Sequence, residues 1–333
     1  MNQLVISGSP HINGSESVKK IMYTVVIAMI PALLVSIYFF GFQVLRVLAV
    51  SVIACVLFEW LIQKFIIKGP LTVNDGSAVV SGMLLAFNIS STVPTLMVIA
   101  GAFVTIAVAK MSFGGLGKNP FNPALVGRVF MLISFPVEMT SWPKPVPIFK
   151  SELIDALTGP TPLAVVKEGL DSGLTIDQIL ASGSVPSVFE ALIGNTSGAL
   201  GEISAMALLL GGIFMVIRKV IDWQIPVTIF VTVYVFAGIF HWIDPAYYMT
   251  PEFHLISGGL VLGAVFMATD MVTSPMSMSG KIVFAVGIGL ITIIIRMWGA
   301  YPEGISFAIL IMNAFVPLIN KAFKPKRFGV VKK

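Results

Sequence analysis

Long apolar stretches, separated by short polar segments, run along most of the chain. A membrane-spanning helix needs roughly 20 consecutive apolar residues, because the hydrocarbon core of a bilayer is about 30 Å thick. About ten stretches approach this length, and they lie at residues 21–41, 44–67, 76–92, 94–113, 121–137, 202–219, 224–243, 254–270, 281–299 and 304–322. The pattern therefore predicts an all-α polytopic membrane protein with about ten transmembrane helices.

Three of the predicted spans, the third, fifth and eighth, are short or interrupted by polar residues and prolines. The third ends in Asn88-Ile89-Ser90-Ser91, and the eighth is followed by Thr273-Ser274-Pro275. Irregular backbone at membrane depth is tolerated where it is buried in protein or lines an internal site. A helix end that the hydrophobic pattern places inaccurately explains the same residues equally well, so two interpretations stand.

The spans fall into two groups of five, one on each side of a long segment. We divide the chain into an N-terminal tail with a first membrane half (1–137), a long loop (138–201), a second membrane half (202–322) and a basic tail (323–333). The third span of each half contains a Ser-Gly pair, Ser81-Gly82 and Ser257-Gly258. Because five is odd, duplicated halves would insert in opposite senses, as in the inverted repeats of many transporters. One dipeptide is short evidence, so a chain without a repeat is the other interpretation.

The composition agrees with a membrane protein and excludes several other classes. Hydrophobic residues make up 56% of the chain and charged residues 11%, whereas soluble domains have about 45–50% and about 25%. A soluble enzyme, a disordered chain and a nucleic-acid-binding module are therefore excluded. Cys55 is the single cysteine, so this chain alone forms neither an internal disulfide nor a cysteine-ligated iron–sulfur cluster.

Basic residues predict the orientation of the chain, because cytoplasmic loops carry an excess of Lys and Arg. They gather before the first span, after the last one and in alternate loops, at Lys19, Lys20, Lys64, Lys68, Lys110, Lys118, Arg128, Arg218, Lys219, Lys281, Lys321, Lys324, Lys326, Arg327, Lys332 and Lys333. Both termini are therefore expected in the cytoplasm. The loop 138–201, with seven acidic residues and three lysines, is expected outside. The first span lacks a small-residue cleavage site after it, so we expect an anchor in the cell (inner) membrane.

The most unusual part of the loop is Asp155-Ala156-Leu157-Thr158-Gly159-Pro160-Thr161-Pro162. A Thr followed by Pro and an apolar stretch predicts a helix start, with Thr161 as the N-cap and Pro162 as the first helical residue. The free N–H groups and partial positive charge of a helix N-terminus also suit a phosphate. A phosphate ester on the Thr161 hydroxyl would be stabilised there, so the run supports a structural and a functional interpretation.

The same run resembles the Asp-x-x-(Ser/Thr)-Gly-Ala-Thr motif, at whose final Thr a flavin transferase attaches FMN through a phosphodiester. Three other stretches support the resemblance: Ser9-Pro10-His11, residues 75–86 and residues 114–124. From about residue 8 to 322, the chain is similar to the NqrB/RnfD family. This family contains the RnfD component of Rnf complexes and the NqrB component of sodium-pumping NADH:quinone reductases. The family's Ala before the modified Thr is Pro160 here, and this proline favours an extended Gly159.

The resemblance implies a membrane electron carrier. Rnf complexes couple electron transfer from reduced ferredoxin to NAD⁺ with export of Na⁺ or H⁺, and this chain would be one component of that translocase. The resemblance implies a flavoprotein and phosphoprotein that carries covalent FMN on Thr161, with a noncovalent riboflavin among the helices. It also implies partner subunits with iron–sulfur and NAD sites, a flavin transferase for maturation, and a lipid bilayer. Thr161 would be a tether, and no catalytic residue or metal ligand is assigned.

Two alternatives remain at this stage. The chain could be the NqrB component of a sodium-pumping NADH:quinone reductase, although its N-terminal segment is short for that protein. It could also be a flavin-free transporter or channel for a small solute, which the interrupted spans and the two halves would fit. The Thr-Gly-x-Thr run argues against the second alternative, because a transporter needs no flavin acceptor outside the membrane.

Several charged residues lie within or beside predicted spans, and four of them suggest a function or a position near a span end. Glu59 and Asp270 are candidates for proton or cation handling. The structural alternatives are a position near the interface with Lys64 for Glu59, and a helix-end cap for Asp270. Arg46 and Arg296 lie near the external ends of their spans, where we expect them to snorkel to the interface.

Overall fold

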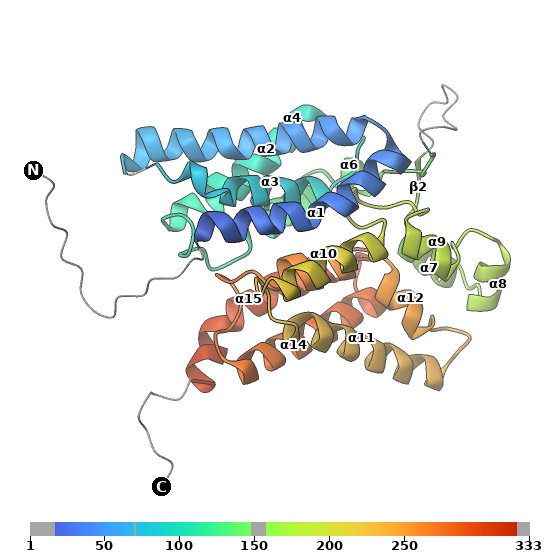
Figure 1. Ribbon diagram of the computed structural model, residues 1–333. Coiled ribbons are helices and arrows are strands. Elements are labelled where there is room, and N and C mark those ends of the chain that lie inside the picture. The colour runs from blue at the N-terminus through green and yellow to red at the C-terminus, as the bar shows by residue number, and fades with distance from the viewer. Residues whose placement is uncertain (1–16, 70, 148–157, 325–333) are drawn as a thin grey trace, which may run out of the picture.

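The computed structural model describes residues 17–69, 71–147 and 158–324. The described part is a bundle of helices with a small group of short elements at one end (Figure 1). The beginning of α1 and the end of α15 lie at the opposite end of the bundle.

Each predicted membrane half contains a set of apolar helices. The first half holds α1 (Val18–Phe40), α2 (Gln43–Leu61), α3 (Ser77–Phe87), α4 (Thr95–Phe103) and α5 (Pro123–Ser134). The second half holds α10 (Ala205–Ile217), α11 (Gln224–Ile243), α12 (Pro251–Ile256), α13 (Leu260–Leu262), α14 (Met278–Trp298) and α15 (Ile305–Ala322). Three helices continue as π-helical segments, at Ile62–Ile67, Val104–Val108 and Gly263–Met267. Two 3-10 turns lie at Val73–Asp75 and Met111–Phe113.

Among the described residues, six helical segments are long and apolar enough to cross a membrane. They are Val18–Phe40, Gln43–Ile67, Thr95–Phe113, Gln224–Ile243, Met278–Trp298 and Ile305–Ala322. The chain is therefore consistent with a multi-pass helical membrane protein, as the apolar pattern predicts. By length and composition, these six segments are fewer than the ten complete spans that the apolar pattern predicts.

Four predicted spans are shorter than a bilayer. Helices α3, α5 and α10 have 11, 12 and 13 residues. At about 1.5 Å per residue they cover roughly 16–20 Å of a core about 30 Å thick. The eighth span is broken between α12 and α13, where Gly258 has φ +67°. The prediction that the third, fifth and eighth spans are short or interrupted is confirmed.

The short sixth span was not predicted from the apolar pattern. Helix α10 begins only after Ser204, whose hydroxyl accepts from the Ala207 N–H at 3.2 Å. It ends at Ile217, and Lys219 adopts the left-handed conformation with φ +55°. An N-cap bond and a left-handed residue therefore end this helix on both sides, inside a longer apolar stretch.

The helices of the two halves pack in similar ways. Helix α2 packs against α3 and α4, and α11 packs against α12 and α14. Helices α1 and α10 pack against each other across the two halves, and Gly211 lies so close to the Ala28 carbonyl that a Cβ would not fit. Val35, near the end of α1, lies by Gly194 together with Ser204, which starts α10. The two helices therefore run antiparallel, as an inverted repeat would require.

The two Ser-Gly pairs play different roles. Gly82 lies inside α3, where an added Cβ would lie 2.8 Å from the Val52 Cα of α2. The Ser51 hydroxyl also donates to the Gly82 carbonyl at 2.7 Å. Gly258, in contrast, is the left-handed residue of a helix break. The dipeptide therefore lies within a helix in the first half and at a helix break in the second.

The described part of the long loop is folded. It holds α6 (Pro136–Thr140), β1 (Trp142–Pro143), β2 (Thr158–Gly159), α7 (Pro162–Asp171), α8 (Ile176–Ala181) and α9 (Val188–Ile193). Its apolar side chains form a small core with two residues that follow α11: Leu163, Val166, Ile176, Ile179, Met249 and Phe253. Ser187 and Glu190 form a capping box at α9, and the Ser187 backbone and side-chain donations lower the pKa of Glu190.

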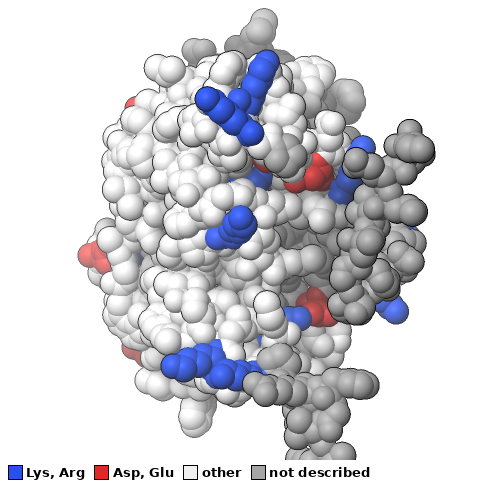
Figure 2. Space-filling view, turned by 90° about the vertical axis from the view of Figure 1, so that its left-hand side faces the viewer, with Lys and Arg blue, Asp and Glu red and all other residues white. Residues whose placement is uncertain are grey.

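Basic side chains are spread over the end of the bundle where α1 begins and α15 ends. Figure 2 shows this face, with Lys and Arg in several places across it. Exposed basic residues in the turns and helix ends are Lys64, Lys68, Lys118, Arg218, Lys219 and Lys321. The folded loop lies at the other end of the bundle, so the separation agrees with the predicted charge asymmetry.

Candidate functional site

Thr161 lies at the start of α7, as its sequence context predicts. Its backbone is extended, with φ −70° and ψ 157°, and its hydroxyl accepts from the Ala164 N–H at 3.3 Å. Pro162 is the first residue of the helix. The preceding residues Thr158 and Gly159 form β2, which pairs antiparallel with β1. The strand and the helix together fix the Thr161 backbone on both sides.

A cavity of about 300 Å³ lies beside Thr161, and we call it the Thr161 cavity. Its wall includes Arg128, Trp142, Thr161, Tyr301, Glu303 and Phe307. The Tyr301 and Phe307 rings are stacked, with centroids 5.5 Å apart and planes inclined by 19°. Thr161 itself is 4% exposed, so its side chain is enclosed by the loop and lies at the edge of this cavity.

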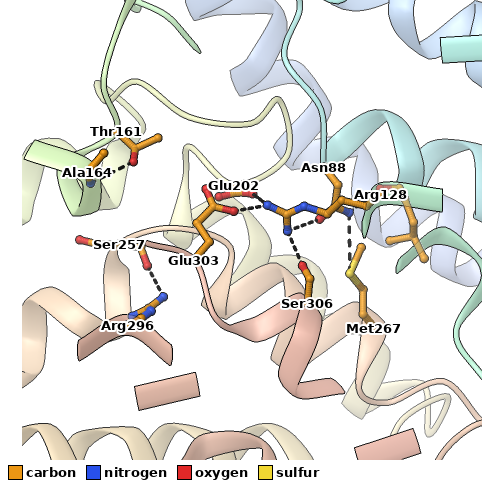
Figure 3. Close-up of polar contacts among 11 residues, drawn as sticks. Asn88, Arg128, Thr161, Ala164, Glu202, Ser257, Met267, Arg296, Glu303 and Ser306 are labelled. Atoms are coloured by element: carbon orange, nitrogen blue, oxygen red, sulfur yellow. Dashed lines mark hydrogen bonds and ion pairs between the residues drawn. The ribbon is translucent and has the colours of Figure 1, made fainter. Parts of the chain in front are cut away.

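Arg128 of α5 is the centre of a buried polar network (Figure 3). Its guanidinium donates to the Asn88 amide oxygen at 3.0 Å and to the Ser306 hydroxyl at 2.5 Å. It also forms ion pairs with Glu303 and, at 3.4 Å, with Glu202. We call Asn88, Arg128, Glu202, Glu303 and Ser306 the Arg128 cluster. A buried cation held by two carboxylates and two neutral acceptors has its donors well satisfied.

The break in the eighth span lies against the same cluster. Arg296 of α14 donates to the carbonyls of His254 and Ser257, at 2.5 and 2.8 Å. These carbonyls belong to the end of α12, where helix termini leave carbonyls without intrahelical partners. A Cβ at Gly258 would lie 3.4 Å from Arg296 Nη2, and one at Gly259 would lie 3.1 Å from Glu202 Oε1.

The two interrupted spans therefore meet at one place. Asn88 ends α3 and accepts from Arg128, while Glu202 lies against the break before α13. The ends of these two interrupted spans therefore contribute to one buried polar cluster. Thr161, at the N-terminus of α7, lies next to the same region (Figure 3).

The profile of the NQR2, RnfD, RnfE family matches residues 5–329. The chain belongs to this family. It is 42% identical over 330 residues to the D subunit of a proton-translocating ferredoxin:NAD(+) oxidoreductase complex from Clostridium ljungdahlii, covering 98% of this chain and 97% of that relative. It is 43% identical over 336 residues to the D subunit of a Na(+)-translocating ferredoxin:NAD(+) oxidoreductase complex from Acetobacterium woodii, covering 100% and 98%. It is 36% identical over 329 residues to the D subunit of an ion-translocating oxidoreductase complex from Stutzerimonas stutzeri, covering 94% and 92%.

Several residues of the family-like motifs lie outside the described part of the chain. Asp155, at the start of the flavin-attachment motif, is one of them, and so are Ser9, Pro10 and His11. The glycine-rich stretch before α5 is described and forms a tight turn, with positive φ at Gly114, Gly115 and Gly117. Asn122 then caps α5 by accepting from the Ala124 and Leu125 N–H groups.

Two basic residues were assigned to the wrong environment by the charge pattern. Lys110 and Arg128 were counted as markers of the cytoplasmic side, but they are 1% and 4% exposed. Lys110 donates to Glu59 at 2.7 Å and to the Ser77 hydroxyl at 2.6 Å. Both lie buried in the bundle with acidic partners, so they say nothing about surface charge.

Three further charged residues have partners that were not foreseen. Glu59 pairs with Lys110 and not with Lys64, which lies over the Trp60 ring, 4.5 Å from its centroid. Arg296 is 7% exposed and does not snorkel. Arg46 is exposed but also donates to the Ser91 carbonyl at 2.9 Å.

Asp270 caps no helix end in the described structure, and it follows the π-helical segment Gly263–Met267, whose C-cap is Ala268. Its carboxylate accepts from the Val272 N–H at 3.3 Å and from the Thr273 hydroxyl at 3.1 Å. The residues that the sequence did not single out are Glu202 and Glu303. An ionisable residue beside an apolar segment is a signal for a functional site, and both residues carry it, but their shared partner Arg128 follows only from the fold.

Proposed function

We propose that this chain is the membrane electron-carrier subunit of an Rnf-type complex, which couples ferredoxin:NAD⁺ electron transfer to translocation of Na⁺ or H⁺. The position of Thr161 carries the proposal. Its hydroxyl lies at a helix N-terminus, at the edge of a cavity with stacked aromatic walls. The names of the curated relatives support the assignment to such a complex.

In this proposal, FMN is linked through its phosphate to Thr161. The N–H groups of the first turn of α7 and the partial positive charge of that helix end suit a phosphodiester. The cavity beside the hydroxyl, about 300 Å³, lies at the lower end of the range for small-molecule sites, about 300–1,000 Å³. The residues present therefore fit the group. Bound FMN would supply the electron storage, and the protein would supply placement and electrostatics.

Pro160 does not argue against the acceptor role of Thr161. A proline restricts the residue before it to an extended backbone, and Gly159 already lies in strand β2. Thr158 lies in the same strand, is exposed, and pairs with Pro143. Thr161, unlike Thr158, lies at the N-terminus of α7, and for this reason we propose Thr161 as the phosphoryl threonine.

Flavin fluorescence in a denaturing gel tests this assignment. The full chain would be produced with a flavin transferase, as wild type and as Thr161→Ala and Thr158→Ala. We expect a fluorescent band in wild type and Thr158→Ala, and loss of the band in Thr161→Ala. A band that persists in Thr161→Ala, or a dark wild type beside a labelled control protein, would contradict the proposal.

We also propose a second, noncovalent flavin, riboflavin, held among the helices. Acid denaturation of the purified chain should release riboflavin into the supernatant and leave FMN on the polypeptide. Chromatography of the supernatant separates the two flavins. A supernatant without riboflavin, from protein whose covalent FMN is complete, would contradict this part of the proposal.

The remaining parts of the proposal concern the assembly. The electrons would reach and leave this chain through partner subunits that hold iron–sulfur and NAD sites, because Cys55 is its single cysteine. Maturation would need a flavin transferase acting on the Thr161 side of the membrane. We propose that this side is external, that both termini are cytoplasmic, and that the ten helical segments form two inverted halves in the cell membrane.

A further inference from the structure

The Thr161 cavity has walls of two kinds. Trp142, Tyr301 and Phe307 supply aromatic surface, while Arg128 and Glu303 supply charge. The isoalloxazine ring of a flavin is flat and aromatic, and its pyrimidine end is polar. The aromatic part of the wall suits the flat ring, and the charged part suits its polar pyrimidine end.

We propose that the isoalloxazine ring of FMN on Thr161 lies in this cavity, with the stacked Tyr301–Phe307 pair against one of its faces and Arg128 as a positioning residue that favours the reduced ring. This inference rests on the proposed attachment of FMN to Thr161. It goes further because it assigns roles to residues of α5 and of the α14–α15 region, far from the attachment motif in sequence.

The aromatic part of the argument rests on geometry. Tyr301 lies just before α15 and Phe307 in its first turn, and their planes differ by 19°. Both side chains are half-buried and line the cavity. Because the two rings stack on each other, the pair can offer one outer aromatic face to a further ring. Base-like ring systems stack on such faces with about 1–3 kcal/mol per ring in nucleic-acid complexes.

The charged part rests on how firmly Arg128 is held. Four side chains from three different regions of the chain accept from its guanidinium, so its direction is fixed before any ligand arrives. Preorganised charge aimed at a place where negative charge develops is effective, because no reorganisation is needed. Charge near the pyrimidine end of a flavin tunes its electronics, and a cation there favours the reduced ring.

Glu303 provides a second test, because its charge is opposite to that of Arg128 and should shift the flavin potential in the opposite direction. Its carboxylate pairs with Arg128 and lines the same cavity. A negative charge beside the ring opposes reduction, so Arg128 and Glu303 should shift the flavin potential in opposite directions. A cluster that only joins the helices together would not produce opposite shifts.

The aromatic contact is tested by flavin fluorescence of the folded chain, because stacked aromatic rings quench it. The full-length protein, flavinylated and purified in detergent, would be compared before and after unfolding. We expect Phe307→Leu to raise the ratio of native to unfolded fluorescence. The matched control is Phe315→Leu, two turns further along α15, where Phe315 is 48% exposed on the outer face. An unchanged ratio in Phe307→Leu would overturn the aromatic assignment.

The charge assignment is tested by redox titration of the same protein, followed by flavin absorbance. We expect Arg128→Gln to disfavour the reduced flavin about tenfold, a fall of about 30 mV for a two-electron couple. We expect Glu303→Gln to shift the potential upward, and the exposed Arg46→Gln to leave it unchanged. Arg128→Gln leaves two buried carboxylates unpaired, so Glu303→Gln is the decisive variant if the first does not fold. A potential that does not rise in Glu303→Gln would overturn the assignment.

Failure of this inference and failure of the proposed function give different results. A chain without covalent flavin in the denaturing gel contradicts the proposed function, and the ring site with it. If the chain carries full covalent flavin but these substitutions change neither the fluorescence ratio nor the flavin potential, only the proposed ring site is overturned.

Discussion

Charged side chains buried in the helical bundle are the main residue-scale feature of this protein. Removing a charge from water is costly unless it is paired and hydrogen-bonded. The Arg128 cluster and the Glu59–Lys110 pair both meet that condition, with Lys110 bound by Glu59 and Ser77. Their partners come from different helices and from the turns between helices, so these residues join separate parts of the bundle as well as balance charge.

We predict that breaking the second pair destabilises the fold. Glu59→Gln should leave Lys110 buried without a carboxylate, and loss of one partner of a buried pair costs about 3–5 kcal/mol. The combined change Glu59→Gln with Lys110→Met should recover part of that loss. Melting temperatures in detergent measure both effects. Lys64→Met, at an exposed site, is the control and should change little, and equal loss in the single and combined variants would contradict the prediction.

We also predict a structural contribution of Thr161 that is independent of flavin. In protein made without the transferase, Thr161→Ala should lower stability by about 1 kcal/mol, because α7 loses its N-cap. Thr161→Ser should retain most of the stability, since its hydroxyl can accept from the Ala164 N–H. Comparing the thermal unfolding of both variants decides this, and equal losses in the two would count against the cap.

At the residue scale, the sequence predicts local features such as helix caps, but it does not predict contacts between residues far apart in the chain. Thr161 as an N-cap follows from its own neighbours, Pro162 above all. The Arg128 partners lie 74 residues away at Glu202 and 175 residues away at Glu303. No periodicity relates residues so far apart, so only the packing of the helices could reveal the cluster.

At the scale of elements, short helices distinguish this protein from a simple bundle of full spans. Polar caps and glycines end them inside apolar stretches, at Asn88, Asn122, Ser204 and Gly258. The hydrophobic pattern detects that a segment is apolar, but a cap is set by one hydrogen bond. The hydrophobic pattern therefore predicts the positions of the helices better than their ends, as α10 illustrates.

The close contact of α1 with α10 gives a prediction for an element pair. Gly211→Val should clash with the Ala28 carbonyl, and overpacking costs about 1–3 kcal/mol or more. Leu210→Val, at the neighbouring position, is the control, because Leu210 is 56% exposed. A melting temperature lowered equally by both variants would show that the contact between the helices is not specific.

At the scale of the whole molecule, the two ends of the bundle differ in their charged residues and in the elements that they carry. Several exposed basic residues lie at the end where α1 begins and α15 ends, and the folded loop lies at the other end (Figures 1 and 2). The positive-inside rule favours the proposed orientation, in which the loop and Thr161 are outside. This arrangement would hold an external flavin on a rigid base formed by both halves.

Labelling of single cysteines tests this orientation. In a Cys55→Ser background, Ser172→Cys in the loop should react with a membrane-impermeant maleimide in intact cells. Lys118→Cys, in the turn before α5, should react only after the cells are opened. Both positions are exposed, so accessibility is the same on either side. The reverse pattern of labelling would contradict the proposed orientation.

The central claim is that Thr161 carries FMN, and peptide mass spectrometry tests it most directly. The full chain would be purified from cells that contain the flavin transferase and then digested. The account predicts that the peptide containing Thr161 carries the added mass of FMN less one water, with fragments that place it on Thr161. An unmodified Thr161 in protein that contains covalent flavin elsewhere, or the added mass on Thr158, would contradict it.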